Sequence, residues 1–217
     1  MRYIVTSLQD LKQIIAHFDQ YHLMTQKRAD YILFKRVVEI MLTKGHLKSE
    51  SESVPTEGGL QEIISIRASM NYGLTDELKA AFPNIIPVAR PLIIDKVIPS
   101  KSWIAGFATA EGCFQIFIRT NGFIGLKFAI TQHSRDKQLM VSLVSNFGCG
   151  TCYKHSTRDS VDYLCFKFTD IDEKIIPFFQ EYPILGVKSL DYQDWLLAAE
   201  LIKSKAHLSS EGKAKIL

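Results

Sequence analysis

The amino-acid sequence predicts an α+β protein in which helices cover one face of an antiparallel sheet. Two observations support this class. From residue 103 onward the apolar residues change from the three-and-four spacing of a helix to strict alternation, and they do so twice. Before residue 87 helical spacing dominates. The resulting order of helix, hairpin, helix, hairpin and further helices leaves the second face of the sheet open.

The first 86 residues are predicted to be mainly helical. A short strand pattern over 3–6 precedes an amphipathic run with apolar residues at helical spacing, Leu8, Leu11, Ile14, Ile15 and Phe18. Further helices are expected over 26–42, 60–70 and 75–81. Residues 50–59 are polar and rich in Ser, Glu and Gly, which indicates a loop. Residues 87–102 contain Pro87, Pro91 and Pro99 and little periodicity, which indicates an extended linker.

The second half of the chain alternates between helices and strands. A helix that includes Trp103 is expected to end at Gly112, and strands over 114–119 and 126–131 flank the turn signal Asn121-Gly122. The remaining elements are expected in the order helix 136–147, strands 151–156 and 161–169, and helices 175–182 and 190–202. In the last strand we expect Leu164, Phe166 and Phe168 to face the helices.

The composition is that of an ordinary globular protein with a sizeable core, since 47% of its 217 residues are hydrophobic and 23% are charged. The net charge of +3 and the pI near 8.6 are compatible with a nucleic-acid partner without requiring one. No apolar run approaches the length of a membrane span, and residues 1–6 lack a signal-peptide pattern. We therefore expect no membrane partner.

The four cysteines favour reduced thiols around a strand. Only Cys149 and Cys152 have the spacing of a metal or redox motif, and His155 is the nearest third ligand candidate. A structural zinc site needs four ligands, and no convincing fourth is present.

The stretch from Trp103 to Phe114 organises the rest of the chain. It predicts a helix of small and apolar residues in which Gly106 and Ala110, like Ala105 and Thr109, stand four positions apart on adjoining faces. Such small faces allow a second helix to approach closely. Glu111 is expected to be the last helical residue, followed by Gly112, which we expect to end the helix with a positive φ.

Residues 104–112, which read Ile-Ala-Gly-Phe-Ala-Thr-Ala-Glu-Gly, resemble the signature helix of the LAGLIDADG homing endonucleases. The resemblance implies an αββαββα repeat whose antiparallel sheet forms a saddle on double-stranded DNA, and a protein encoded in an intron of a mitochondrion or another organelle. It also implies that two such helices pack at a pseudo-two-fold axis, each with one metal-binding acid. Glu111 and Gly112 then bind a divalent cation, expected to be Mg²⁺, and Ala105, Gly106, Thr109 and Ala110 contact the partner helix.

An internal repeat with an offset of 161 positions relates the two halves of the chain. The identical pairs are Phe18 and Phe179, Tyr21 and Tyr182, Lys27 and Lys188, Asp30 and Asp191, Tyr31 and Tyr192, Lys44 and Lys205, His46 and His207, and Leu47 and Leu208. We therefore predict three parts: residues 1–86 as the C-terminal half of a first repeat, 87–102 as a linker, and 103–217 as an essentially complete second repeat. The first signature helix would lie roughly fifty residues upstream, in a longer protein or in an ancestor that was truncated.

Three side chains are candidates for catalysis. Phosphodiester hydrolysis needs a metal ion that activates water and stabilises charge on the phosphate oxygens, and Mg²⁺ prefers carboxylate oxygens such as those of Glu111. By resemblance, Gln132 at the end of the second strand lies beside the metal. Lys188 resembles the active-site lysine of the family, and its recurrence at Lys27 is expected if each DNA strand meets one lysine.

DNA-reading residues are expected on the outward side of the strands, because an antiparallel ribbon can enter the major groove. This group comprises Gln115, Phe117, Arg119, Lys127, Ala129, Thr131, Lys154, Tyr163, Cys165 and Lys167. Arg135, Lys137 and Arg158 lie off the strands and are candidates for phosphate contacts, which fix register more than sequence.

These features together predict a site-specific, Mg²⁺-dependent DNA endonuclease that functions in intron homing. With one signature helix, the chain is expected to be unable to cut both strands as a monomer, so it would be inactive or only nick. The alternatives are a maturase-like splicing partner of intron RNA or a DNA-binding remnant without nuclease activity. A third reading is a homodimer that pairs two signature helices through Gly106 and Ala110.

Overall fold

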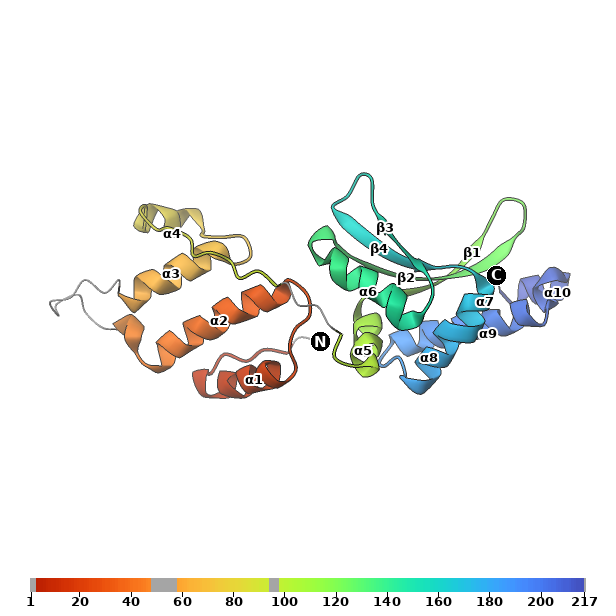
Figure 1. Cartoon of the computed structure of the whole chain (residues 1–217), viewed down its shortest axis with the longest axis horizontal. Coiled ribbons are helices and arrows are strands. Elements are labelled where there is room, and N and C mark those ends of the chain that lie inside the picture. The colour runs from red at the N-terminus through yellow and green to blue at the C-terminus, as the bar shows by residue number, and fades with distance from the viewer. Residues whose placement is uncertain (1–2, 48–57, 94–97, 217) are drawn as a thin grey trace. The chain divides into compact units, whose positions relative to one another are not determined.

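The computed structural model describes residues 3–47, 58–93 and 98–216 (Figure 1). The chain forms two compact units, Met1–Asp95 and Lys96–Leu217, each with its own hydrophobic core. Within the described residues, no helix has both the length and the apolar composition that crossing a membrane requires.

The first unit is helical, as predicted. Its elements are α1 (Leu8–Gln20), α2 (Lys27–Leu42), a 3-10 turn (Gly45–Leu47), α3 (Gly59–Ser69) and α4 (Asp76–Ala81). Leu33 and Ile40 of α2 form its core cluster with Ile66 of α3. An ion pair of 2.8 Å between Arg90 and Asp30 connects the segment after α4 to α2. The loop predicted over 50–59 lies outside the described residues except for Gly58 and Gly59, the second of which begins α3.

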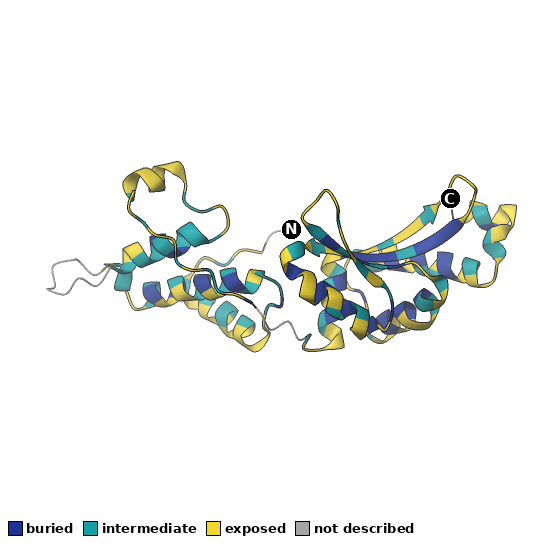
Figure 2. Ribbon diagram, turned by 45° about the horizontal axis from the view of Figure 1, so that its top comes forward, coloured by how far each residue is buried: buried dark blue, intermediate teal, exposed yellow. Residues whose placement is uncertain are grey.

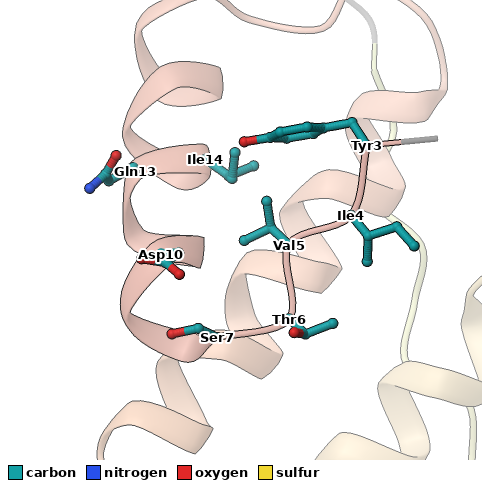
Figure 3. A pocket seen from close by; sticks show the side chains of 8 residues that line it. All are labelled: Tyr3, Ile4, Val5, Thr6, Ser7, Asp10, Gln13 and Ile14. Carbon is teal, nitrogen blue, oxygen red and sulfur yellow. The ribbon is translucent and has the colours of Figure 1, made fainter. Parts of the chain in front are cut away.

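The strand predicted over residues 3–6 is wrong. These residues are extended but pair with no strand in the described part of the chain, and Tyr3 and Ile4 are exposed. Alternating apolar residues become a strand only where a neighbouring strand supplies hydrogen bonds. Together with one side of α1, residues 3–7 line a shallow hollow of about 420 Å³ (Figure 3). Asp10 is the only carboxylate among its lining residues, so the hollow offers no pair of acids for catalysis.

The second unit contains one antiparallel sheet, which confirms the predicted α+β class. The strands are β1 (Gly112–Ile118), β2 (Ile124–His133), β3 (Thr151–Lys154) and β4 (Ser160–Cys165), arranged in the order β1-β2-β4-β3. Figure 1 shows the helices of this unit gathered on one side of the sheet. They are α5 (Lys101–Glu111), α6 (Lys137–Phe147), α7 (Phe168–Asp170), a π-helical turn (Ile171–Ile175), α8 (Ile176–Glu181), α9 (Lys188–Lys203) and α10 (Ser210–Ala214).

An aromatic cluster attaches the sheet to α8 and α9. Phe114 of β1 lies at its centre, with ring centroids 4.9 to 5.6 Å from those of Phe128, Phe179, Tyr192 and Trp195. Such aromatic pairs contribute about 0.5–1.5 kcal/mol each beyond the burial of their area. On β2, the predicted inward residues Leu126, Phe128 and Ile130 are buried, and Figure 2 shows this strand as the most continuously buried part of the sheet.

The predicted facing of β4 is wrong by one residue. Val161, Tyr163 and Cys165 are buried against the helices, whereas Leu164 is half-buried on the opposite face. The strand ends at Cys165, so Phe166 and Phe168 lie outside it, and Phe168 begins α7. Apolar residues occupy both alternating positions here. Pairing with β2, rather than the local pattern, decides which set faces the core.

Candidate functional site

The end of α5 joins directly to β1, and Gly112 makes this junction possible. Gly112 has φ −70° and ψ 150°, so the expectation of a positive φ is wrong. Its backbone N–H donates to the Ala108 carbonyl, and a Cβ at this position would overlap that same carbonyl group. A glycine is therefore required by close packing, and the chain leaves the helix and enters the strand without an intervening turn.

Glu111 is an exposed carboxylate at the C-terminal end of α5. Among the described residues it has no hydrogen-bond or ion-pair partner. A negative charge at this end of a helix is unfavourable, because the terminal carbonyl groups carry a partial negative charge of their own. Both features favour a cation at this place.

The described residues contain no group of three His, Cys, Asp or Glu side chains close enough to enclose a metal ion. Mg²⁺ commonly binds through one or two carboxylates and keeps several waters, so a single carboxylate with water or phosphate oxygens suits it. The donor set at Glu111 therefore fits a hydrated hard cation and does not fit a closed structural metal site.

Lys188 contacts Gly112, the residue that follows Glu111. Its Nζ donates a hydrogen bond of 2.7 Å to the Gly112 carbonyl oxygen, although the two residues are 76 positions apart. Two further contacts connect α9 and the segment before it to α5 and β1: Leu185 N–H donates to Thr109 Oγ1 at 3.3 Å, and Trp195 Nε1 donates to the Gln115 carbonyl at 3.1 Å. The lysine amine is thus held at the helix-to-strand junction.

Gln132 belongs to the same end of the sheet. Gly112 pairs with Ile130 across β1 and β2, and Gln132 lies two residues further along β2, half-buried and paired with Val161 on the side of the helices. The fold therefore places the three predicted catalytic residues at one end of the sheet, where a hydrogen bond holds the Lys188 amine and the strand register positions Gln132.

The small residues of α5 divide between two environments. Ala105 is buried in the core of its own unit and offers little surface to a second helix. Thr109 is half-buried, and its hydroxyl donates to the Ala105 carbonyl at 2.8 Å. Gly106 and Ala110 are exposed, and within the described residues no atom of another element lies within 4 Å of a Cβ built on Gly106. The surface available to a second helix is therefore the one with Gly106 and Ala110.

The sheet face opposite the helices, here called the open face, is defined by the strand register, because cross-strand partners share a face. It comprises Cys113, Gln115 and Phe117 of β1, Lys127, Ala129, Thr131 and His133 of β2, Thr151 and Tyr153 of β3, and Ser160, Asp162 and Leu164 of β4. Lys127 pairs with Gln115 near the β1–β2 turn. In that turn the Arg119 guanidinium lies 5.8 Å from the ring centroid of Phe117 and 5.2 Å from that of Phe123, a cation–π arrangement that positions its charge.

Four residues predicted on the open face are located elsewhere, and one of them, Lys167, lies beyond the end of β4. Tyr163 is fully buried, and its hydroxyl donates to the Cys149 carbonyl at 3.0 Å. Cys165 is also buried, with its Sγ 3.9 Å from that of Cys149. Lys154 is exposed but pairs with the inward-facing Val161, so it lies on the helix side of β3.

The remaining basic candidates are exposed and lie off the strands. Arg135 and Lys137 follow β2, Arg158 lies between β3 and β4, and Lys167 follows β4. Local sequence reasoning missed Tyr153, Leu164 and Asp162 on the open face. The pairing of β2 with β4 places them there, and only a correct register could have identified them.

Burial also changes the acidity of the groups behind β4. Burial, together with the neighbouring cysteines, raises the pKa of Tyr163 well above its usual range. The hydrogen bond to Cys149, followed by burial, raises the pKa of the Cys165 thiol. All four cysteines are free thiols. Tyr163 and Cys165 are therefore neutral core residues at ordinary pH.

Comparison with known proteins identifies relatives of this architecture. The family profile described as "LAGLIDADG endonuclease" matches residues 1–38 and 104–199. A Neurospora crassa protein named "Probable intron-encoded endonuclease 3" is 40% identical over 98% of this chain, but the match covers 39% of that protein. The chain therefore spans less than half of this curated relative.

Two solved structures share the fold closely. The LAGLIDADG homing endonuclease I-GzeII in complex with its DNA target is 45% identical with a TM-score of 0.91, over 97% of this chain and 72% of that one. I-SmaMI, bound to uncleaved DNA in the presence of calcium ions, is 42% identical with a TM-score of 0.90, over 98% of this chain and 72% of that one.

Proposed function

The chain belongs to the LAGLIDADG endonuclease family, and on this premise we propose that it acts in a site-specific DNA endonuclease that hydrolyses phosphodiester bonds with a divalent cation. One observation carries the proposal. Glu111, which has no partner among the described residues, lies at a junction where Lys188 donates a hydrogen bond to the carbonyl of the next residue, at one end of the open face. The names of the relatives also favour a nuclease over an RNA splicing factor.

We assign separate tasks to the residues at the junction. Glu111 would hold Mg²⁺, which supplies water activation and charge stabilisation on the phosphate when bound. The Gly112 carbonyl, the second proposed ligand, accepts from the Lys188 amine here and would bind the cation only after that hydrogen bond is released. The Lys188 amine adds a fixed positive charge beside the same junction, suited to the phosphate. The Gln132 amide can donate and accept hydrogen bonds and would orient water.

The open face would bind double-stranded DNA in its major groove. Gln115, Lys127 and Thr131 supply polar side chains that can reach base edges, and Arg119 is held at the β1–β2 turn. Phosphate contacts would come from the exposed cations off the strands, Arg135, Lys137, Arg158 and Lys167.

We further propose that residues 1–86 are the C-terminal half of one repeat, 87–102 a linker and 103–217 a second repeat. The separate match of residues 1–38 to the family profile supports this division. A second signature helix, from a longer form of the protein or from another chain, would pack on Gly106 and Ala110 and bring the second acid. An organellar location follows the relatives' description as intron-encoded proteins.

A two-stage assay tests the proposal. A duplex target is first selected from a randomised library with Ca²⁺ present, and Mg²⁺ is then added to measure nicking and double-strand cleavage separately. We expect Glu111→Gln to bind the selected duplex as the wild type does and to cut neither strand. Efficient double-strand cutting by a chain shown to be monomeric would contradict the assignment of one active acid per chain, and unchanged cleavage by the variant would refute the site.

A further inference from the structure

An acidic side chain lies in the middle of the open face, where a polyanion is proposed to bind. Asp162 of β4 pairs with Thr131 of β2 on one side and with Tyr153 of β3 on the other. Its Oδ1 is shielded from solvent and has no hydrogen-bond partner, and no described residue forms an ion pair with its carboxylate. A shielded acceptor without a donor is unfavourable, which calls for an explanation from outside the chain.

The chemistry of the carboxylate restricts what can satisfy it. An ionised carboxylate only accepts hydrogen bonds, and DNA phosphates only offer further acceptors and negative charge. In the major groove the available donors are the N4 amine of cytosine and the N6 amine of adenine. Adenine presents its N7 acceptor beside N6, which repels a second carboxylate oxygen, whereas cytosine presents no such acceptor.

The neighbouring rows of the face support this reading. Moving two residues along β4, the next row of the open face contains Leu164, with Ala129 and Thr151 as its cross-strand partners. Successive residues on one strand face lie about 7 Å apart, and this row offers no positive charge that could neutralise Asp162 from that side. The row on the other side pairs Ser160 with His133, whose ring lies 3.4 Å from the Asp159 carboxylate. Only Oδ1 of Asp162 is shielded, so Oδ2 remains available to a donor that approaches the open face.

We propose that Asp162 is a specificity-determining residue that selects a cytosine in the major groove of the target. The proposal rests on the DNA-binding role proposed for the open face. Asp162 would lower the overall affinity for DNA, because its carboxylate repels the phosphates, and would raise the preference for cytosine at one position of the target.

The test measures the affinity of the full 217-residue chain for a selected duplex and for single-base variants of it, by fluorescence anisotropy with Ca²⁺ at two salt concentrations. We expect the wild type to prefer cytosine at one position by roughly ten-fold, the size of a single specific base contact. Asp162→Asn should abolish that preference or transfer it to adenine, because an amide pairs with N6 and N7 of adenine. It should also bind unrelated duplexes more tightly than the wild type.

Asp159→Asn is the matched control, because it makes the same charge change in the loop that directly precedes β4. Asp159 is exposed between β3 and β4, its carboxylate accepts a hydrogen bond from Ser134, and His133 Nε2 lies 3.4 Å from Oδ2. We expect this variant to raise affinity for all duplexes without changing any base preference. If Asp162→Asn unfolds, as judged by circular dichroism, Asp162→Ser removes the same charge in a smaller side chain.

The outcomes separate the two proposals. A wild type with clear base preferences that Asp162→Asn leaves unchanged overturns the role of Asp162 and leaves the proposed function standing. The same base shift in Asp159→Asn also overturns it, since the effect would then be general electrostatics. A wild type that binds all duplexes alike refutes the DNA-reading face, and the inference about Asp162 with it.

Discussion

Replacing Tyr163 with Phe should weaken the fold of the second unit and leave DNA binding unchanged. The side chain is fully buried, and its hydroxyl donates to the Cys149 carbonyl at 3.0 Å behind β4. The substitution keeps the ring, which packs against Phe147 and Gly150, and removes one oxygen. Its effect therefore isolates the hydrogen bond from the packing.

The expected loss follows from leaving a buried carbonyl without its donor. Such a change costs about 1–3 kcal/mol of the free energy of unfolding. For a unit of this size, each kcal/mol lowers the melting temperature by roughly 4 °C. Thermal unfolding followed by circular dichroism should thus show a midpoint roughly 4–12 °C below that of the wild type. The affinity for a selected duplex, measured well below the midpoint, should stay within a factor of about two.

Tyr153→Phe is the matched control, since it removes the same hydroxyl from an exposed position on the open face. Its midpoint should change little, because surface substitutions without partners lie within about ±0.5 kcal/mol. If Tyr163→Phe melts like the wild type and loses DNA affinity, the placement of Tyr163 in the core is refuted, and the reasoning from strand register fails with it.

Three further outcomes are expected. Lys188→Met should lower the cleavage rate of the selected duplex far more than the affinity for it, because the substitution removes the amine that donates to the Gly112 carbonyl. An unchanged cleavage rate would contradict the proposed role of Lys188. Gly112→Ala should lower the midpoint of urea unfolding, since its Cβ would overlap the helix backbone, and a wild-type midpoint would show that the junction relaxes freely. Raising the pH above about 9 should reduce the free energy of unfolding. Burial raises the pKa of Tyr192 to about 12, and the folded state also raises the pKa values of Tyr163 and Cys165. The unfolded chain therefore loses these protons at a lower pH than the folded chain does. Urea titrations from pH 9 to 11 measure this slope, and a stability that rises with pH over that range would contradict it.

The helices of the second unit could be predicted from the sequence because their signals are local. The apolar spacing and the boundary glycines at residues 112 and 148 give α5 and α6 to within two residues at their ends. The alternation along β2 likewise identifies its buried side, because lysine and threonine occupy the other positions.

The facing of β4 could not be predicted in the same way, because its signal is not local. Both alternating sets contain apolar or amphipathic residues, and only the pairing of Tyr163 with Ile130 of β2 shows which set lies inside. The same limit explains the missed open-face residues Tyr153 and Asp162. The contact of Lys188 with Gly112 spans 76 positions, so periodicity could not indicate it, and only the family resemblance brought these residues together.

The candidate site coincides with the places where the second unit leaves its own groups unsatisfied. Glu111 has no ion-pair partner at the unfavourable end of α5, no other element lies within 4 Å of a Cβ built on Gly106, and Asp162 has no donor for a shielded oxygen, all within the described residues. Each feature lowers the stability of the isolated unit, and each is relieved by a different external group: a metal ion, a second helix or a base. Ser160 Oγ on the same face is also shielded without a partner among the described residues. Because buried polar groups are usually hydrogen-bonded, the gathering of such groups of the second unit on the open face indicates a surface that binds an external group.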